Sequence, residues 1–184
     1  KNSKTDSVIF SDFRHGIFNK QSIPILSKSI DKKVFKVADS QVASRWGNIL
    51  EFKNFNLITP NEREARFALA DQDSIIRPLA LELYKKAKCK ILILKCGERG
   101  SLTFTSDKAT AKSFFNLDSF TNNVIDPVGA GDALLAYSTY SYIQTKSPYV
   151  SSIIGSIAAS LECETDGNIP ILKSDVIKRV EEIE

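Results

Sequence analysis

The sequence predicts an α/β fold of three layers, with helices on both faces of a mainly parallel sheet that also carries an antiparallel hairpin. Short β-branched and aromatic runs alternate with longer segments whose apolar residues recur at helical spacing. The chain has 184 residues, the length of about one domain, with 42% hydrophobic and 26% charged residues. It has no internal repeat and no linker-like stretch, so we expect residues 1–184 to form a single domain.

The first half of the chain predicts four strands, each a short β-forming run that ends in a polar loop. They are expected at Val8–Phe10, Val34–Ala38, Asn56–Thr59 and Lys90–Lys95. A helix is predicted from Ser22 to Lys32, with Ser22 as its N-cap and Pro24 in its first turn. The apolar face of this helix is expected to contain Ile23, Leu26 and Ile30.

Two more helices are predicted between the third and fourth strands. The first is expected at Glu62–Leu69, after the turn formed by Pro60 and Asn61. The second is indicated by apolar residues at positions i, i+3, i+4, i+7 and i+11. These residues are Ile76, Leu79, Ala80, Leu83 and Ala87. Strands joined through helices predict right-handed crossovers and parallel pairing.

After the turn at Gly97–Gly100 the pattern changes. Ser101–Thr105 and Thr110–Phe115 are expected to form the antiparallel hairpin. Three helices are then predicted, at Gly129–Gln144, along Val150–Leu161 and near Ser174–Glu182. The apolar face of the first is expected to contain Ala133, Ala136, Tyr137, Tyr140 and Ile143.

Composition excludes several classes of protein. The apolar content is too high for disorder, and the longest apolar runs are far shorter than the roughly 20 residues of a membrane span. The net charge of +3 and the absence of a dense Lys/Arg run predict neither a nucleic-acid nor a membrane partner. Three cysteines without a CxxC pair predict reduced thiols in a cytoplasmic protein. Because the chain has no Met, residue 1 is not expected to be the natural start.

The segment Asp126–Asp132 (DPVGAGD) leads directly into a predicted helix. Glycines at a helix start leave backbone N–H groups uncovered, and with the helix dipole these favour a phosphate. Asp132 in the first turn would lie beside that phosphate and could accept a proton from an attacking hydroxyl. The alternative is an ordinary glycine turn in which the dipole alone favours Asp132. A Rossmann fingerprint fits poorly because Leu134 occupies the position of its third small residue, and a Walker loop lacks its Gly-Lys-Ser/Thr.

On these residues the chain resembles the ribokinase-like (PfkB) carbohydrate kinases, whose C-terminal signature is similar to Asp126–Asp132. Ser11–Gly16 resembles a stretch of the heptose 7-phosphate kinase branch, and Leu57–Glu64 resembles its Thr-Pro-Asn-x-x-Glu segment. Leu94–Gly100 is similar to the strand and glycine turn that lie near the nucleotide. The resemblance covers most of the chain and implies a ribokinase-like fold.

The resemblance also implies phosphoryl transfer from ATP to a hydroxyl of a sugar or sugar phosphate. Asp132 would be the catalytic base, and the amides of Gly129, Ala130 and Gly131 would form the anion hole. Asn61 would bind phosphate and, with Glu64, hold Mg²⁺ through water. The residues implied to line the nucleotide are Lys95, Gly97, Gly100 and, on the helix around Gly155–Ala159, Ser156. The resemblance further implies a substrate contact from Asp12 and a monovalent cation near Asp126 in some relatives.

Each of these assignments has a purely structural alternative. Asn61 and Glu64 would be a helix start with first-turn acids, a role that Glu62 fits better than Glu64. The turn containing Gly97 and Gly100 would bind no ligand. Asp12 and Asp39, both at strand ends, would make only local turns. His15 is interpreted as a surface residue.

Two departures from the family pattern stand out. Val128 replaces a frequent Thr or Ser, so any hydroxyl contact to phosphate there is lost. The early strands, the lid and most sugar contacts of the family are not visible, so the chain resembles the C-terminal, nucleotide-binding portion. The alternative function is therefore a nucleotide-binding or regulatory module without independent kinase activity. The edge of such a shortened sheet would favour pairing of two copies as a homodimer.

Overall fold

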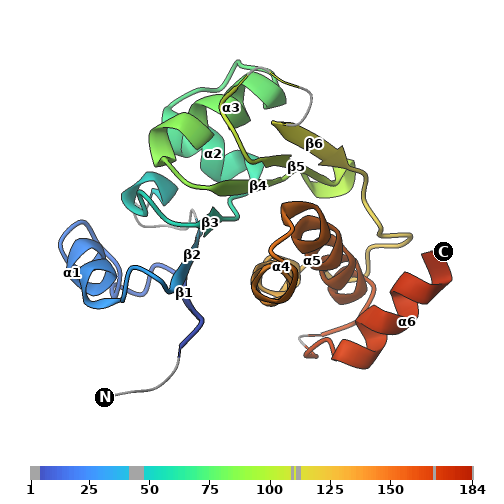
Figure 1. Cartoon of the computed structure of the whole chain (residues 1–184). Helices are drawn as coiled ribbons and strands as arrows, with labels where there is room; N and C mark the ends of the chain where they lie inside the picture. Colours follow the sequence, from blue (N-terminus) through green and yellow to red (C-terminus); the bar gives the residue numbers. More distant parts are fainter. Residues whose placement is uncertain (1–4, 42–47, 109, 111–112, 168, 184) are drawn as a thin grey trace. The chain divides into compact units, whose positions relative to one another are not determined.

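Six strands form one sheet whose spatial order follows the chain, β1-β2-β3-β4-β5-β6 (Figure 1). The computed structural model describes residues 5–41, 48–108, 110, 113–167 and 169–183. Contacts divide the chain into two units. The first unit contains Lys1–Cys96 and Leu102–Phe115, with nearly all of the sheet, and the second contains Gly97–Ser101 and Asn116–Glu184. The predicted α/β class and mainly parallel sheet are confirmed, whereas the single domain remains a prediction.

The parallel part of the sheet consists of the four predicted strands. They are β1 (Ser7–Asp12), β2 (Phe35–Ser40), β3 (Leu57–Ile58) and β4 (Ile91–Lys95). The register aligns Asp12 with Ser40 at the ends of β1 and β2. A parallel bridge between Asn61 and Lys95 continues the pairing beyond β3. As a result, four polar residues that are far apart in the sequence occupy one edge of the sheet, where parallel strands present ligand sites.

The predicted hairpin is present as β5 (Ser101–Phe104) and β6 (Phe114–Leu117). The connection over residues 105–113 is shorter than the dozen or so residues that a parallel crossover needs, so the pair is antiparallel. The second strand begins at Phe114 and not at Thr110, because Thr110 and Ser113 form a turn in which the Ser113 N–H donates to the Thr110 carbonyl (3.0 Å). Positions 111 and 112 of the expected strand lie outside the described residues.

The three helices of the first unit are α1 (Ser22–Ser29), α2 (Glu62–Leu69) and α3 (Ile76–Ala87). The bounds of α2 and α3 match the prediction. For α1 the predicted N-cap was wrong: Gln21 is the N-cap, and the Asn19 Oδ1 accepts the N–H groups of Gln21 and Ser22 (2.9 Å each). The helix also ends before Lys32, because Ile30 is extended. Leu26 is more exposed than its apolar spacing predicted.

The core of the first unit includes an aromatic cluster, and three of its members, Phe18, Phe52 and Phe55, lie outside the elements that the sequence predicted. Phe10 of β1 packs on Phe18, Phe52 and Phe55, with ring centroids 5.0–6.1 Å apart. Phe52 follows a short 3₁₀ helix, η1 (Ile49–Glu51), whose N-terminus is capped by the side chain of Asn48. Edge-to-face packing fixes the relative orientation of such rings. The cluster therefore anchors Phe52 and Phe55, which precede β3.

The second unit contains η2 (Gly97–Arg99), α4 (Ala130–Thr145), α5 (Pro148–Cys163) and α6 (Lys173–Ile183). Helices α4 and α5 lie side by side (Figure 1). The predicted apolar face of α4 was right only in part, because Ala133 and Tyr137 pack against the core of the second unit but the other positions differ. Tyr140 and Ala136 are exposed, whereas the buried residues are Leu134, Leu135, Ser138, Thr139 and Ser141.

The reason is close packing between α4 and α5. A Cβ built on Gly155 would lie 1.9 Å from the Ser138 Oγ, so α5 can approach α4 at this point only because a glycine is present. The Ser151 hydroxyl donates to the Ser138 carbonyl (2.8 Å) across the same contact. Small residues thus take the place of large apolar ones at this contact. Hydrophobic periodicity therefore does not predict which face of α4 is buried. None of the helices in the described ranges combines the length and apolar character needed to span a membrane.

Candidate active site

Asp12 lies at the carboxyl end of β1 and is 3% exposed. Its Oδ1 accepts the Arg14 N–H (2.8 Å), and its Oδ2 accepts Arg14 Nη1 and the Ser40 hydroxyl. Arg14 is itself buried, with a φ of 60°, a backbone region that favours glycine. Asp12 therefore makes a local turn, as its structural alternative predicted. It also binds the buried guanidinium of Arg14, a contact that the sequence did not predict. Its predicted substrate contact stays a prediction.

Lys95 ends β4 and forms an ion pair with Asp39 of β2, with the Nζ 3.1 Å from the Asp39 Oδ2. Asp39 is buried, and its Oδ1 has no hydrogen-bond partner among the described residues. Buried polar atoms are nearly always hydrogen-bonded, so this oxygen marks a place where a ligand donor or cation would be stabilised. The sequence predicted Lys95 as a site residue, but it did not predict the ion pair of Lys95 on β4 with Asp39 on β2.

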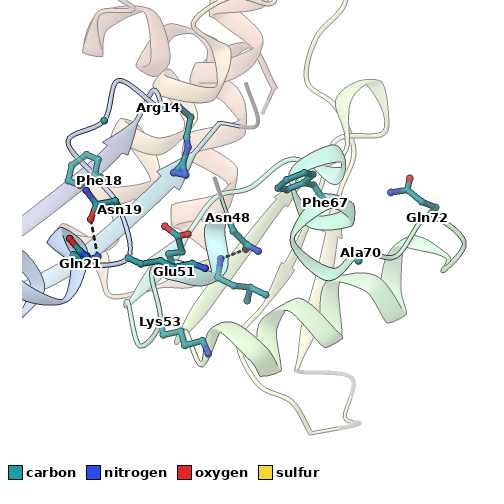
Figure 2. A pocket seen from close by; sticks show the side chains of 13 residues that line it. Arg14, Phe18, Asn19, Gln21, Asn48, Glu51, Lys53, Phe67, Ala70 and Gln72 are labelled. Atoms are coloured by element: carbon teal, nitrogen blue, oxygen red, sulfur yellow. Dashed lines mark hydrogen bonds between the residues drawn. The ribbon is translucent and has the colours of Figure 1, made fainter. Parts of the chain in front are cut away.

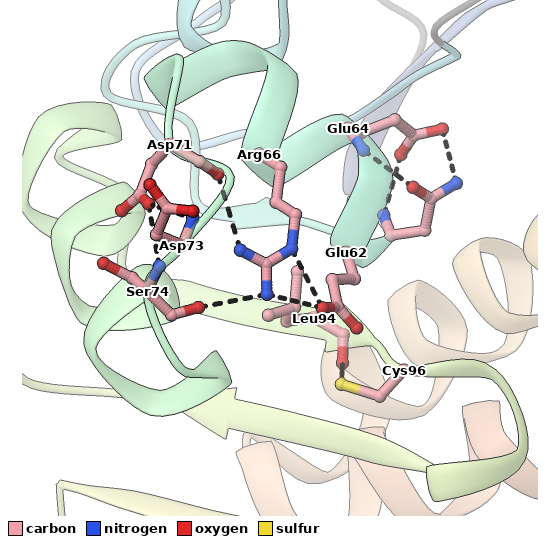
Figure 3. A network of polar contacts seen from close by, with 9 residues as sticks. Glu62, Glu64, Arg66, Asp71, Asp73, Ser74, Leu94 and Cys96 are labelled. Atoms are coloured by element: carbon pink, nitrogen blue, oxygen red, sulfur yellow. Dashed lines mark hydrogen bonds and ion pairs between the residues drawn. The ribbon is translucent and has the colours of Figure 1, made fainter.

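Asn61 and Glu64 form a capping box at the start of α2. The Asn61 Oδ1 accepts the Glu64 N–H (2.8 Å), and the Glu64 Oε2 accepts the Asn61 N–H (2.7 Å). The Asn61 side-chain amide also donates to the Glu64 Oε1 (2.8 Å). The interpretation that Glu62 fits a structural role better than Glu64 was wrong. Glu62 pairs with Arg66 one turn later, and Glu64 caps the helix (Figure 3).

These side chains offer only oxygen atoms to a metal, and oxygen is what Mg²⁺ prefers. Both oxygens of Glu64 and of Asp12 already accept hydrogen bonds from neighbouring residues. No three His, Cys, Asp or Glu side chains within the described segments are placed to share a metal ion. The residues thus fit a magnesium ion that keeps its own water molecules and contacts the protein mainly through them.

In the second unit, Gly129 is the N-cap of α4, with φ 88°, and no side chain of the described residues caps this helix. The first bond of the helix runs from the Ala133 N–H to the Gly129 carbonyl (2.9 Å). Upstream, the Asp126 Oδ1 accepts the Val128 N–H (2.9 Å), which fixes the entry turn. Asp132 is exposed in the first turn. The Ala130 N–H donates to the Pro127 carbonyl (3.4 Å), and the anion-binding role of this helix start stays a prediction.

Glu162 is a residue near this helix that sequence reasoning missed. It lies near the end of α5 and is 4% exposed. Burial raises the pKa of its carboxyl, and the negative charges of Asp126 and Asp132 raise it further. The loop carrying Asp126 is tied to α5, because the N–H groups of Ile125 and Asp126 both donate to the Cys163 carbonyl (2.7 and 3.1 Å). No sequence signal distinguishes Glu162 from other helical acids.

The predicted nucleotide turn is held by its glycines. Gly97 and Gly100 both have positive φ, and the Gly100 N–H donates to the Gly97 carbonyl (2.9 Å). A Cβ on Gly100 would lie 2.0 Å from the Leu117 carbonyl oxygen, so no larger residue fits there. This packing gives Gly100 a structural role whether or not a ligand binds. Ser101, just after the turn, has its hydroxyl 3.3 Å from that of Ser156 on α5.

The predicted site residues thus fall in two groups. Along the sheet edge of the first unit lie Asp12, Asn61, Glu64 and Lys95. In the second unit lie Gly97, Gly100, Gly129, Ala130, Gly131, Asp132 and Ser156. Their catalytic and binding roles stay predictions.

The chain matches one family model, and its fold is similar to those of solved structures. Residues 27–174 match the model described as pfkB family carbohydrate kinase. The structure is similar to ribokinase from Thermotoga maritima (TM-score 0.76, 18% identity), covering 96% of this chain and 57% of that one. It is also similar to Arabidopsis thaliana ribokinase complexed with ribose and ATP (TM-score 0.77, 18% identity), covering 96% of this chain and 56% of that one.

A curated relative is the bifunctional protein HldE of Sulfurimonas denitrificans, 24% identical over 178 residues. That match covers 95% of this chain and 35% of the relative. The chain therefore spans about a third of this relative and somewhat more than half of the similar structures.

Proposed function

Because the chain belongs to the pfkB family of carbohydrate kinases, we propose that it is the nucleotide-binding portion of a kinase that transfers phosphate from ATP to a hydroxyl of a sugar or sugar phosphate. The observation that carries the proposal is the start of α4, where a glycine N-cap leaves the helix without a side-chain cap and Asp132 stands in the first turn. The segments Ser11–Gly16 and Leu57–Glu64, which resemble the heptose 7-phosphate kinase branch, favour a heptose phosphate as the specific acceptor.

In the proposed reaction, the acceptor hydroxyl oxygen forms a bond to the γ-phosphorus of ATP while the bond to the β–γ bridging oxygen breaks. The hydroxyl proton passes to Asp132, and ADP leaves. The amides of Gly129, Ala130 and Gly131 stabilise the negative charge on the transferred group, with the dipole of the sixteen-residue helix α4 behind them. Bound Mg²⁺ would supply charge neutralisation on the phosphates, and Asn61 and Glu64 would hold it through water.

The remaining predicted residues have consistent supporting roles. The turn containing Gly97 and Gly100 would admit the nucleotide, with Ser156 on α5 lining it. Lys95 would contact the nucleotide, and Asp12 would meet the sugar, at the sheet edge where open α/β sheets bind ligands. A monovalent cation near Asp126 belongs to the same proposal, as does location in the cytoplasm.

A second candidate function is a nucleotide-binding or regulatory module without kinase activity of its own. It is favoured by the extent of the chain, which spans 57% of the Thermotoga ribokinase. In the described sheet, β1 pairs only with β2, so its other edge would be available to a second copy in a homodimer.

Calorimetry with ATP and Mg²⁺, followed by kinase assays on neutral sugars and sugar phosphates, tests the proposal. We expect Asp132→Asn to retain nucleotide binding and to lower turnover by about 10²–10⁴-fold, the usual contribution of a general base. Asp166→Asn, at an exposed position of the same unit, serves as the matched control. Undiminished turnover in Asp132→Asn would remove the residue from the base role, and nucleotide binding without any turnover in the natural chain would favour the regulatory module.

A further inference from the structure

Two buried polar atoms without a hydrogen-bond partner lie at the carboxyl ends of neighbouring strands. They are the Asp39 Oδ1 and the Thr59 Oγ1, two of the three such side-chain atoms among the described residues. The parallel register of β2 and β3 makes Asp39 and Thr59 neighbours, since it aligns the residue before each of them. Because buried polar atoms are nearly always hydrogen-bonded, this pair indicates a place where a polar ligand approaches the sheet.

Lys95 of β4 belongs to the same group. Successive residues of a strand point to opposite faces of the sheet. Ala38, Ile58 and Leu94, which each precede one of the three polar residues, all belong to the core of the first unit. The three polar residues therefore share the opposite face. Since β3 lies between β2 and β4, the Lys95 side chain crosses the line of β3 to reach Asp39 at 3.1 Å.

The ion pair orders the Lys95 side chain before any ligand binds. A lysine side chain is flexible, and fixing it is an entropic cost that ligand binding would otherwise bear. Only 18% of the Lys95 side chain and 9% of the Asp39 side chain are exposed, so solvent screens the pair weakly. An ammonium has three donors, and Asp39 is the only side-chain partner of this one within the described ranges. Two donors are thus left for a ligand.

The polar lining of the large cavity in the first unit differs in this respect. This cavity has a volume of about 1030 Å³ and lies beside η1. The Asn48 side chain caps η1, and the Asn19 side chain accepts the Gln21 N–H (Figure 2). The guanidinium of Arg14 pairs with Asp12. In the described part of the chain, this cavity therefore offers no unsatisfied buried groups comparable to those at the sheet edge.

We infer that Asp39 is a positioning residue, which holds the Lys95 ammonium for a phosphate group of the nucleotide. The inference rests on the proposed function, in which Lys95 contacts the nucleotide. It adds the group that is contacted and the residue that orients the lysine. The two remaining N–H donors of the ammonium bind phosphate oxygens, while the carboxylate keeps the ammonium at the sheet edge.

The carboxylate of Asp39 also repels a phosphate, so the sign of its effect is decisive. If orientation of Lys95 dominates, loss of the carboxylate weakens ATP binding, and if repulsion dominates, the same loss strengthens it. We expect orientation to dominate, because the ammonium contacts the carboxylate directly and neutralises it.

Calorimetry with ATP and with adenosine, both in the presence of Mg²⁺, tests the inference. Lys95→Gln should weaken ATP binding at least about tenfold and leave adenosine unchanged, because adenosine has no phosphate. Asp39→Asn should have the same selectivity but a smaller effect, about threefold, since asparagine still accepts a hydrogen bond without its charge. The matched control is Glu82→Gln, which removes the carboxylate partner of Lys86 on α3 and should change neither ligand.

A double-mutant cycle then separates positioning from a merely structural role. In the Lys95→Gln background, Asp39→Asn should have no further effect on ATP binding, because Asp39 acts through the lysine. Tighter ATP binding by Asp39→Asn would overturn the inference, as would equal effects in the two backgrounds or equal losses of ATP and adenosine. If the natural chain bound neither ATP nor adenosine, the proposed function itself would be wrong, and the inference would fall with it.

Discussion

Asn61 and Glu64 are joined by three hydrogen bonds that run in both directions between their side chains and backbones. An Asn-x-x-Glu pattern therefore has a complete structural explanation in this chain, as the N-terminal cap of α2. Asn61 is also bridged to Lys95 at the sheet edge, where Mg²⁺ and phosphate are proposed to bind. The charge of Glu64 and its capping role must be separated by experiment.

Glu64→Gln makes that separation, because glutamine also closes a capping box. We expect the free energy of unfolding to fall by about 0.5–1 kcal/mol, because glutamine keeps the bond from the Asn61 N–H but its amide nitrogen cannot accept the one from the Asn61 side-chain amide. If Glu64 holds the metal through water, the affinity for ATP in the presence of Mg²⁺ should fall at least about tenfold. Chemical denaturation and calorimetry at several Mg²⁺ concentrations measure the two effects. Asn61→Ala, which removes both side-chain bonds of the cap, should cost more, about 1–2 kcal/mol of stability. Unaltered Mg²⁺ dependence in Glu64→Gln would leave Glu64 a purely structural role.

Gly155→Ala should destabilise the chain, although alanine is the better helix former by about 0.5–1 kcal/mol. The added methyl would lie 1.9 Å from the Ser138 Oγ and 3.0 Å from the Leu134 carbonyl oxygen. Overpacking of this kind costs about 1–3 kcal/mol, so the clash outweighs the propensity. Adding Ser138→Ala should recover only part of the loss, because the Ser138 Cβ is also within 3.2 Å. Thermal unfolding of the two variants tests this, and a more stable Gly155→Ala would contradict the described packing of α4 on α5.

The ion pair between Glu164 and Arg179 predicts a dependence on pH. Hydrogen bonding to Arg179 lowers the pKa of Glu164 below its ordinary 4.5. The stabilisation is therefore present above pH 4.5 and is lost as the pH falls through the lowered pKa. Glu164→Gln should reduce stability by about 1 kcal/mol at pH 7, and the difference should shrink in acid. The control is Glu182→Gln, since Glu182 contacts the same arginine at 3.3 Å but is half exposed. Equal effects of the two variants at neutral pH would argue against the pair.

The cysteines should differ in reactivity. Burial raises the pKa of the Cys89 thiol to about 12 from 9.0, which lowers its thiolate fraction at pH 8 about 1,000-fold. Burial and the nearby Glu162 also raise the pKa of Cys163. Iodoacetamide labelling followed by mass spectrometry should therefore modify Cys96 first and Cys89 last, and urea should abolish the order. Early modification of Cys89 in the folded chain would contradict its described burial.

The sequence predicted the parallel strands and the bounds of α2 and α3, because each of these elements carries its own local pattern. The prediction from sequence failed where packing between elements determines which residues are buried. The buried face of α4 contains Ser138, which binary patterning counts as polar, and the approach of Gly155 is what buries it. The aromatic cluster around Phe52 was missed because its segment has neither helical nor strand periodicity.

The site shows the same division. Glycines and Asp132 near the start of α4 form a contiguous motif and could be found by spacing alone. The pairing of Asp39 with Lys95 depends on the register of strands that are distant in the sequence. The partner of Asp12 is only two residues away, but a buried Arg14 in a left-handed conformation has no sequence signature. Contacts that form only in the tertiary structure could thus not be predicted from local sequence patterns.

The match between strand order and chain order has a consequence for biosynthesis. Each parallel strand pairs with the one made immediately before it, so no strand waits for a later one to be inserted between earlier neighbours. As the polypeptide leaves the ribosome, each new parallel strand can pair with the edge of the strand that was synthesised before it. Growth of the described sheet by successive addition exposes one new strand edge at a time besides the outer edge of β1, which limits the opportunity for nascent chains to aggregate during translation.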